Sequence, residues 1–348
     1  MNNTDTQLIT IKRVAREAGV SAQTVSRVIN DRPDVAPATR SRVLEVIERL
    51  GYQPNIVARS LSRRRSHTLG VVTAGLQYIG PSRTLNGITN MAEELGYTLL
   101  LKELPGFKTH DVAAILNYLL ARQVDGIIWA VQEVGDNRKS FELRLPSLSV
   151  PIVFLTTEER PGFNIVASDN QAGARLATEH LLKLGHRCIG HIAGPLNWWE
   201  ARERKRGWEQ TMAGAGLAVG AECWGEGAWS SASGEESMHI LLERNPELTA
   251  VFCANDQMAL GALLYAHRHG ITVPGDLSIV GLDDILETAY FWPPLTTITH
   301  NQYDLGCRAV TEVVQAIDLK TKNGEAPHPG NIIIQPMLIV RGSTGPAK

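Results

Sequence analysis

Apolar side chains recur at helical spacing along the first fifty residues. The first such run, which follows Thr10 as a helix-capping residue type, consists of Ile11, Val14, Ala15 and Ala18. Gly19 then permits a turn, and Ser21 can cap a second helix over 22–29. A third helix is predicted over 37–50, with an apolar face made of Val43, Leu44, Ile47 and Leu50. Two short helices joined by a glycine turn and braced by a third indicate a helix-turn-helix unit.

The second predicted helix has a polar face with an unusual composition. In VSAQTVSRVIN (20–30), Gln23, Thr24 and Arg27 stand where a solvated helix more often carries Lys and Glu. In a helix-turn-helix unit this helix enters the major groove, where Gln reads adenine and Arg reads guanine through paired hydrogen bonds. The residues suited to phosphate contacts are Ser21, Thr24 and Asn30. The alternative interpretation is a three-helix packing domain with an incidental polar face.

From residue 67 the pattern changes to apolar strand runs that alternate with helical stretches. The predicted strands lie at 68–74, 97–101, 125–131, 151–155, 188–193, 250–256 and 277–284. The predicted helices lie near 82–95, 109–121, 170–184, 198–215 and 256–269. This alternation predicts an α/β body of parallel sheets covered by helices on both faces. Two such series indicate two lobes with a ligand cleft between them, at the carboxyl ends of the strands.

Charge is distributed unevenly between these parts. Of 34 Lys and Arg and 36 Asp and Glu residues, residues 1–67 hold twelve basic and six acidic ones, a net of +6, which leaves 22 against 30, a net of −8, for the rest. A small basic module ahead of an acidic body favours contact with a polyanion such as DNA. The start of the chain is polar, without a signal-peptide core, and no apolar run is long enough to span a membrane, so a cytoplasmic protein is expected.

Signatures of catalysis, metal binding and cofactor binding are missing from the sequence. There is no GxSxG, P-loop or HExxH motif, and GAGLAVG (214–220) follows a predicted helix rather than a strand. The histidines of HRH (267–269) point apart on a helix. The four cysteines are far apart and are expected to be reduced and buried. We therefore expect no enzyme, cofactor or metal site; an enzyme carrying a DNA tether is the alternative of another class.

The segments TIKRVAREAGVSAQTVSRVIN and TRSRVLEVIERLGYQPNIVARSL resemble the DNA-binding head of the lactose/galactose repressor family. The resemblance implies a head over 1–53 in which Ala22, Gln23 and Arg27 read bases. It also implies that 54–66, too short for a stable isolated helix, is a hinge helix that orders on DNA, capped by Asn55 and wedging Leu61 into a minor-groove step. The implied DNA-contacting residues are Thr10, Ser21, Ala22, Gln23, Thr24, Arg27, Asn30, Asn55, Ala58 and Leu61.

The resemblance continues through GPLNWWEARERKRGW, CANDQMALGA, VGLDD and PPLTTI. It implies a periplasmic-binding-protein-like body over 67–342, which binds a small effector and dimerises, and a tail over 343–348. The first lobe is placed at about 67–168 plus 300–329, and the second at about 169–299 plus 330–342. The implied effector-binding residues are Tyr78, Trp199, Glu200, Arg204, Trp229, Asn255, Asp283 and His300. At least one of Trp198 and Trp199 is expected to face the ligand, and Trp208 and Trp224 to lie in the core.

The chemistry of these residues suits a sugar. Arg, Asp and Asn offer paired hydrogen bonds to vicinal hydroxyls, and Trp229 offers a flat wall for sugar C–H groups. Compared with the lactose repressor, Ala130 and Thr156 reduce the first-lobe polar contacts, and Glu200 adds a carboxylate. A β-glycoside or disaccharide effector is therefore predicted.

The alternative effector within the family is a purine acting as corepressor, stacked on Tyr78 and Trp129. No leucine heptad ends the chain, so a homodimer on a near-palindromic operator is expected, without a tetramerisation helix. Whether the effector releases or promotes DNA binding stays open, as do the operator and the regulated genes.

Overall fold

The structure is a computed structural model that describes residues 9–52, 65–107, 111–142, 148–217, 219–323 and 330–348. The chain divides into two compact units, Met1–His67 and Thr68–Lys348. Among the described residues, no helix is both long and apolar enough to cross a bilayer. The hinge residues inferred from the resemblance, Asn55, Ala58 and Leu61, lie outside the described residues.

The first unit contains the three predicted helices, α1 (Ile11–Ala18), α2 (Ala22–Ile29) and α3 (Pro37–Leu50). Gly19 ends α1 in the left-handed conformation at φ 62°, which a residue without a Cβ adopts at little cost. Ser21 caps α2, because its Oγ accepts a hydrogen bond from the Thr24 backbone N–H at 3.0 Å. The small core of the unit consists of Val14, Ala15, Ala18, Val25, Val28, Val43 and Val46.

Two details of the predicted head are wrong. Leu44, placed on the buried face of α3, is 49% exposed, and Val46 is buried instead, because the face of α3 that meets α1 and α2 runs through Val43 and Val46. Thr10 precedes α1 in an extended conformation, but its side chain makes no capping hydrogen bond. Only the backbone carbonyl of Thr10 accepts from the first turn, from Arg13 and Val14.

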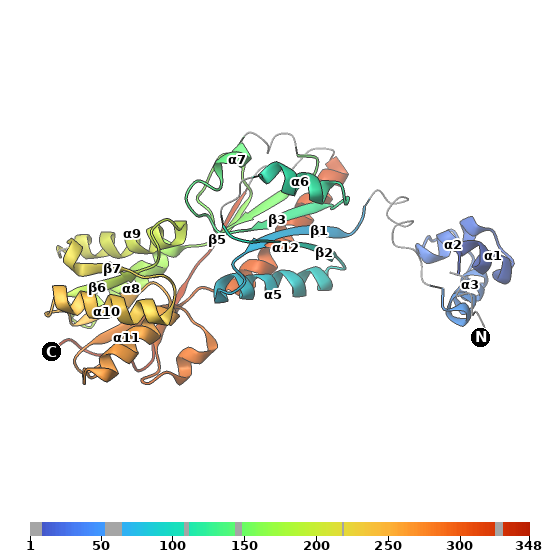
Figure 1. Ribbon diagram of the computed structural model, residues 1–348. Helices are drawn as coiled ribbons and strands as arrows, with labels where there is room; N and C mark the ends of the chain where they lie inside the picture. Colours follow the sequence, from blue (N-terminus) through green and yellow to red (C-terminus); the bar gives the residue numbers. More distant parts are fainter. Residues whose placement is uncertain (1–8, 53–64, 108–110, 143–147, 218, 324–329) are drawn as a thin grey trace, which may run out of the picture. The chain divides into compact units, whose positions relative to one another are not determined.

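The second unit begins with a six-stranded parallel sheet in the order β11-β5-β4-β3-β1-β2. Alternate residues of β3 face opposite sides: Ile127 and Trp129 pack with α6, whereas Ile128 and Ala130 pack with α5 and α12. Figure 1 shows these helices on the two faces of the sheet. The elements are β1 (Thr68–Ala74), α5 (Ile79–Glu94), β2 (Thr98–Leu104), α6 (Val112–Leu120), β3 (Gly126–Ala130), α7 (Lys139–Glu142), β4 (Ile152–Leu155), β5 (Ile165–Ser168), α12 (Gln302–Asn323) and β11 (Asn331–Ile334).

The second sheet has the order β12-β10-β9-β8-β6-β7 and is parallel except for β12. Residues of α8 and α9 cover one face and residues of α10 and α11 the other. The elements are α8 (Asn170–Lys183), β6 (Ile189–Ala193), α9 (Trp199–Gly214), η2 (Ala221–Cys223), β7 (Trp224–Glu226), α10 (Ser231–Arg244), β8 (Ala250–Cys253), α11 (Asp256–Arg268), β9 (Ser278–Asp283), η3 (Leu286–Tyr290), β10 (Thr296–Thr299) and β12 (Met337–Ile339). The predicted α/β class with two parallel-sheet lobes is confirmed.

The predicted division of the C-terminal residues needs two corrections. Residues 330–342 were assigned to the second lobe, but β11 pairs with β5 in the first sheet, and only β12 joins the second. The segment predicted as a tail, 343–348, packs against the second lobe, where the Ser343 hydroxyl is buried and donates to the Ile279 carbonyl at 2.6 Å. His186 contacts the Gly345 carbonyl at 3.0 Å. The chain thus crosses between the lobes once more, between Ile334 and Met337.

Candidate functional site

Apart from Thr10, which precedes α1, the predicted DNA-contacting residues of the head lie along α2, from its N-cap Ser21 to its C-cap Asn30. Gln23 and Arg27 are exposed, as the prediction of base contacts requires. Ser21 is exposed as well, and its hydroxyl lies 2.9 Å from that of Thr24. Ala22 is half-buried against the core of the head, so only part of its methyl group faces outward.

Arg27 is held in place by an acidic residue of the next loop. Its Nη1 lies 3.1 Å from Oδ2 of Asp34, with both side chains about half exposed. Asn30 ends the helix, and its side-chain amide donates to the Ser26 carbonyl at 2.8 Å. Such an exposed ion pair contributes little to stability.

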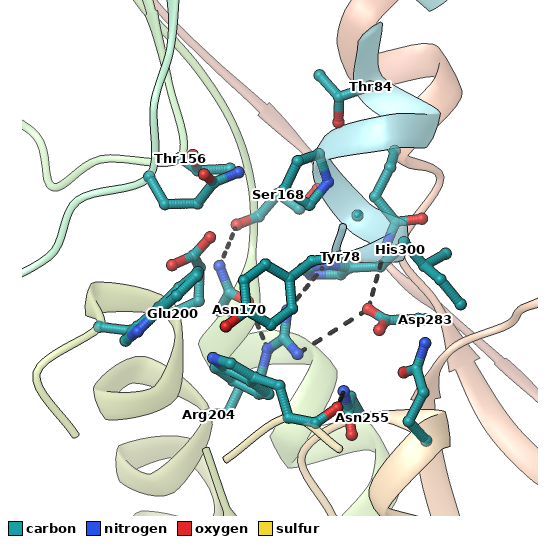
Figure 2. A pocket seen from close by; sticks show the side chains of 18 of the residues that line it. Tyr78, Thr84, Thr156, Ser168, Asn170, Glu200, Arg204, Asn255, Asp283 and His300 are labelled. Carbon is teal, nitrogen blue, oxygen red and sulfur yellow. Dashed lines mark hydrogen bonds and ion pairs between the residues drawn. The ribbon is translucent and has the colours of Figure 1, made fainter. Parts of the chain in front are cut away.

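The second candidate site is a cavity of about 570 Å³ in the second unit, and residues of both lobes line it. The lining residues follow the carboxyl ends of strands: Tyr78 after β1, Gln132 after β3, Thr156 after β4, Asn255 after β8 and His300 after β10. This is the edge at which parallel α/β sheets place their ligands. Figure 2 shows Thr156 and Glu200 at one side of the cavity and Asp283 and His300 at the other.

Arg204, on α9, contacts four other residues at the floor of the cavity. Its Nε donates to Oδ1 of Asn170 at 2.8 Å, and its Nη1 donates to the Ala254 carbonyl at 2.5 Å. Nη1 also lies 3.9 Å from Oδ1 of Asp283, and Nη2 lies 3.4 Å from Nδ1 of His300. These contacts fix the orientation of the guanidinium, and Figure 2 draws those to side chains as dashed lines.

Aromatic rings form one wall of the cavity. The Trp198 ring lies between those of Tyr78 and Trp229. The distance between ring centroids is 5.7 Å in each pair, and both pairs are edge-to-face. The Arg204 guanidinium lies over the Trp229 ring at 5.5 Å. Gly194 leaves room for that ring, since a Cβ at this position would lie 2.1 Å from it. A wall of flat apolar faces beside fixed polar groups can bind a ring that has both C–H and hydroxyl surfaces.

Burial alters the titration of several groups around the cavity. It raises the pKa of Glu200 to about 7, against the lowering effect of Arg204. It raises the pKa of Asp283 to about 6, again opposed by Arg204. Burial and the nearby positive charge of Arg204 hold the pKa of His300 well below its usual value. His300 is therefore neutral, and with Nδ1 facing a guanidinium donor, its Nε2 carries the hydrogen.

The structure brings together seven of the eight predicted effector-binding residues. Those that line the cavity are Tyr78, Glu200, Arg204, Trp229, Asn255, Asp283 and His300. The exception is Trp199, which packs against the core of the first lobe; its neighbour Trp198 lines the cavity instead. Of the two predicted core tryptophans, Trp208 is fully buried and Trp224 is half-buried.

Several polar lining residues were missed, namely Thr84, Gln132, Ser168, Asn170 and Gln257. Gln132 and Asn170 each come two residues after a strand, which is the signal that could have found them. The strand before Asn170, β5, is only four residues long and was itself missed. Among the described residues, no cluster of three or more His, Cys, Asp or Glu side chains could hold a metal ion.

Comparison with known proteins places both units. Residues 10–55 match the model of bacterial regulatory proteins of the lacI family, and residues 178–344 match that of a periplasmic binding protein-like domain. The lactose operon repressor of Escherichia coli K12 is 34% identical over 97% of this chain and 91% of its own length. The PurR transcriptional repressor of Haemophilus influenzae PittEE is also 34% identical, over 97% of this chain and 98% of its own.

Solved structures agree with these relatives. The lac repressor dimer bound to operator and the anti-inducer ONPF matches with a TM-score of 0.85 and 32% identity, covering 97% of this chain and 100% of that chain. The complex of the transcriptional regulator CelR with cellobiose matches with a TM-score of 0.69 and 31% identity, covering 96% and 99%.

Proposed function

The chain belongs to the lacI family of bacterial regulatory proteins, and we propose that it is a repressor controlled by a small sugar. Membership of this family makes it a DNA-binding transcriptional regulator and not an enzyme. The sugar, a β-glycoside or disaccharide, binds between the two lobes and changes the affinity for a near-palindromic operator. The site of action is the cytoplasm, where the operator DNA is.

The observation that carries the sugar assignment is the combination of a fixed Arg204 with an aromatic wall. Arg204, Asp283 and Asn255 supply donors and acceptors close together, as vicinal hydroxyls require. Trp198 and Trp229 supply the flat faces for the C–H side of a ring. One structural relative is described as a complex with cellobiose, a disaccharide, which supports the same ligand class.

A purine corepressor is the second candidate, because a relative of equal identity is the PurR repressor. A planar base needs stacking partners in the first lobe, for which Tyr78 and Trp129 are the sequence candidates. Trp129 is fully buried, with its ring centroid 4.5 Å from that of Phe141, and does not line the cavity. Of the first-lobe candidates, Tyr78 alone is left for stacking, so the sugar is favoured.

On the DNA side, Gln23 and Arg27 read base edges, and Ser21, Thr24 and Asn30 contact phosphates. Ala22 contacts the methyl group of a base, and Thr10, which precedes α1, contacts the DNA backbone. Asn55, Ala58 and Leu61 contact the operator as well. An effector that prefers one lobe arrangement changes operator affinity, with a coupling of about 1–3 kcal/mol as in other allosteric proteins.

The protein acts as a homodimer, which matches two operator half-sites. Support comes from an apolar surface on and after η3, where Leu286, Tyr290 and Trp292 are 77%, 89% and 90% exposed. Large apolar side chains exposed together are typical of a protein interface. Sedimentation analysis of Trp292→Asp is expected to give monomer where the parent chain gives dimer; an unchanged dimer would remove this surface from the proposal.

The test of the function is a thermal-shift screen with mono- and disaccharides, methyl β-glycosides and purines. A ligand at 100 times its Kd stabilises the body by about 2.7 kcal/mol, which is roughly 5–11 °C for a domain of this size. A shift with a sugar, followed by a change in operator affinity in a gel-shift assay with the same sugar, supports the proposal. Shifts with purines alone would overturn it.

A further inference from the structure

Three polar side chains at one end of the cavity present acceptor atoms without a partner. Among the described residues, nothing hydrogen-bonds to Oε2 of Glu200, Oε1 of Gln132 or Oγ1 of Thr156, although all three atoms are buried. The side chains of Glu200 and Gln132 are more than nine-tenths buried. A buried acceptor left unpaired costs about 1–3 kcal/mol, so this end of the cavity is unfavourable until a donor group occupies it.

Backbone hydrogen bonds bring these three residues together from separate elements. The Glu133 N–H donates to the Thr156 carbonyl at 3.4 Å, which places Gln132 beside Thr156. The Trp199 N–H donates to the Glu133 carbonyl at 3.0 Å, which places Glu200, in the first turn of α9, beside both. We call Gln132, Thr156 and Glu200 the acceptor cluster. It spans the two lobes, since the first two residues belong to the first lobe and Glu200 to the second.

The opposite end of the cavity has a different character. There Gln302 donates through Nε2 to Oδ1 of Asp283 at 2.9 Å, and the unpartnered Nε2 of His300 is a donor. Arg204 lies between the two ends (Figure 2). One end therefore offers donors and acceptors together, whereas the acceptor cluster offers carboxylate, amide and hydroxyl oxygens.

We propose that the acceptor cluster is a second-ring subsite, in which Glu200 selects a neutral disaccharide by accepting hydrogen bonds from the free hydroxyls of its second ring. This inference rests on the proposed sugar function and deepens it. The first ring lies over Arg204 and Asp283, against Trp229. The second ring extends toward Glu200, Gln132 and Thr156, whose oxygens it supplies with donors. Above about pH 7, where Glu200 is ionised, a phosphorylated or acidic second ring is rejected, because its oxygens would face the Glu200 carboxylate.

The test compares one-ring and two-ring ligands on one variant. From the screen above, the tightest-binding disaccharide and the methyl β-glycoside of its first ring are titrated by calorimetry into the full-length protein. In Glu200→Gln, which keeps the shape but loses the carboxylate, the Kd of the disaccharide is expected to rise tenfold or more. The Kd of the methyl glycoside is expected to change less than twofold. The matched control is Glu203→Gln, a half-buried glutamate on the same helix that does not line the cavity.

Each other outcome counts against a specific statement. If no sugar binds the parent protein, the proposed function itself fails. If sugars bind but Glu200→Gln raises the Kd of the one-ring and two-ring ligands equally, Glu200 does not contact the second ring specifically. The second-ring subsite is then wrong. An unchanged disaccharide Kd in Glu200→Gln, or tight binding of a disaccharide phosphorylated on its second ring, also overturns the subsite. Thermal unfolding of both variants verifies that they are folded.

Discussion

Arg204 and Asp283 form an ion pair across the floor of the cavity, with 3.9 Å between Nη1 and Oδ1. The pair joins α9 to the end of β9, and Arg204 also bonds to Asn170 and the Ala254 carbonyl. Replacing Arg204 with Ala removes the central donor of the site. Hydrogen bonds to charged groups contribute about 1.5–3 kcal/mol each. We therefore expect the sugar Kd to rise at least a hundredfold, as measured by calorimetry, with operator affinity unchanged.

A matched control lies on the same helix. Arg206 pairs with Glu203 at 2.7 Å, and its side chain is more than half exposed, so Arg206→Ala is expected to leave the sugar Kd within twofold. Because Arg204→Ala leaves Asp283 buried without its cation, Arg204→Lys is needed as a folded comparison that keeps the charge. A normal sugar response in Arg204→Ala would contradict the assignment.

Arg27 provides a prediction for the head. If it reads a guanine, Arg27→Ala loses about 1–3 kcal/mol of discrimination at one base pair of each half-site. Selection from a randomised DNA library, followed by gel shifts on the selected operator, measures the relaxed preference. Arg49→Ala is the control, because Arg49 is an exposed residue of α3 paired with Glu17. The same loss of preference in both variants would mean that Arg27 contributes only charge.

Much of this architecture follows from local patterns in the sequence. The bounds of α1, α2 and α3 agree with the predicted helices because each has a clear beginning and a clear end, such as Gly19 after α1. The strands β5, β7, β10, β11 and β12, each of three or four residues, were missed, whereas the equally short β4 and β8 were predicted as parts of longer apolar runs. The lobe bounds implied by the resemblance placed 330–342 in the second lobe as one piece, whereas β11 joins the first sheet and β12 the second. Long-range pairing, here β11 with β5, decides such boundaries.

The sequence predicted most of the residue types that line the cavity, but it could not predict which of two adjacent side chains points into it. Trp198 and Trp199 are adjacent, and periodicity could not decide which one faces the cavity. The decision comes from the contact between the lobes, where Val134 and Trp198 form an antiparallel bridge that turns Trp199 toward the core of the first lobe. Gln132, in contrast, was missed although it directly follows a predicted strand (125–131), at the end where parallel strands place ligand contacts.

Gly194 gives a prediction about the aromatic wall. A Cβ at this position would lie 2.1 Å from the Trp229 ring, so Gly194→Ala has to displace the ring. Overpacking of this kind costs about 1–3 kcal/mol, and we expect both a lower Tm and a weaker sugar affinity. Gly214→Ala is the control, since nothing lies within 4 Å of the added methyl group at the end of α9. Equal effects of the two substitutions would contradict the role of Gly194.

The last prediction concerns pH. The pKa of Glu200 is raised by burial from 4.5 to about 7, so the folded protein holds this proton where the unfolded chain has released it. The folded state is therefore favoured below about pH 4.5, and this contribution is lost as the pH rises through 7. His180, His186, His191 and His300 have lowered pKa values and act in the opposite sense below about pH 6.5.

Because these histidines, and Asp283 with its pKa raised by burial to about 6, titrate as well, the quantity to measure is the difference between the parent protein and Glu200→Gln. The free energy of unfolding is measured for both ligand-free proteins between pH 5 and 8. As the pH rises over this range, that of the parent is expected to fall by up to about 3 kcal/mol relative to that of the variant. Glu133, whose pKa is lowered by its bonds to Arg160 and Thr157 although burial opposes this, titrates below that window and does not interfere. A difference that stays constant over this range would show that Glu200 is ionised in the folded protein throughout.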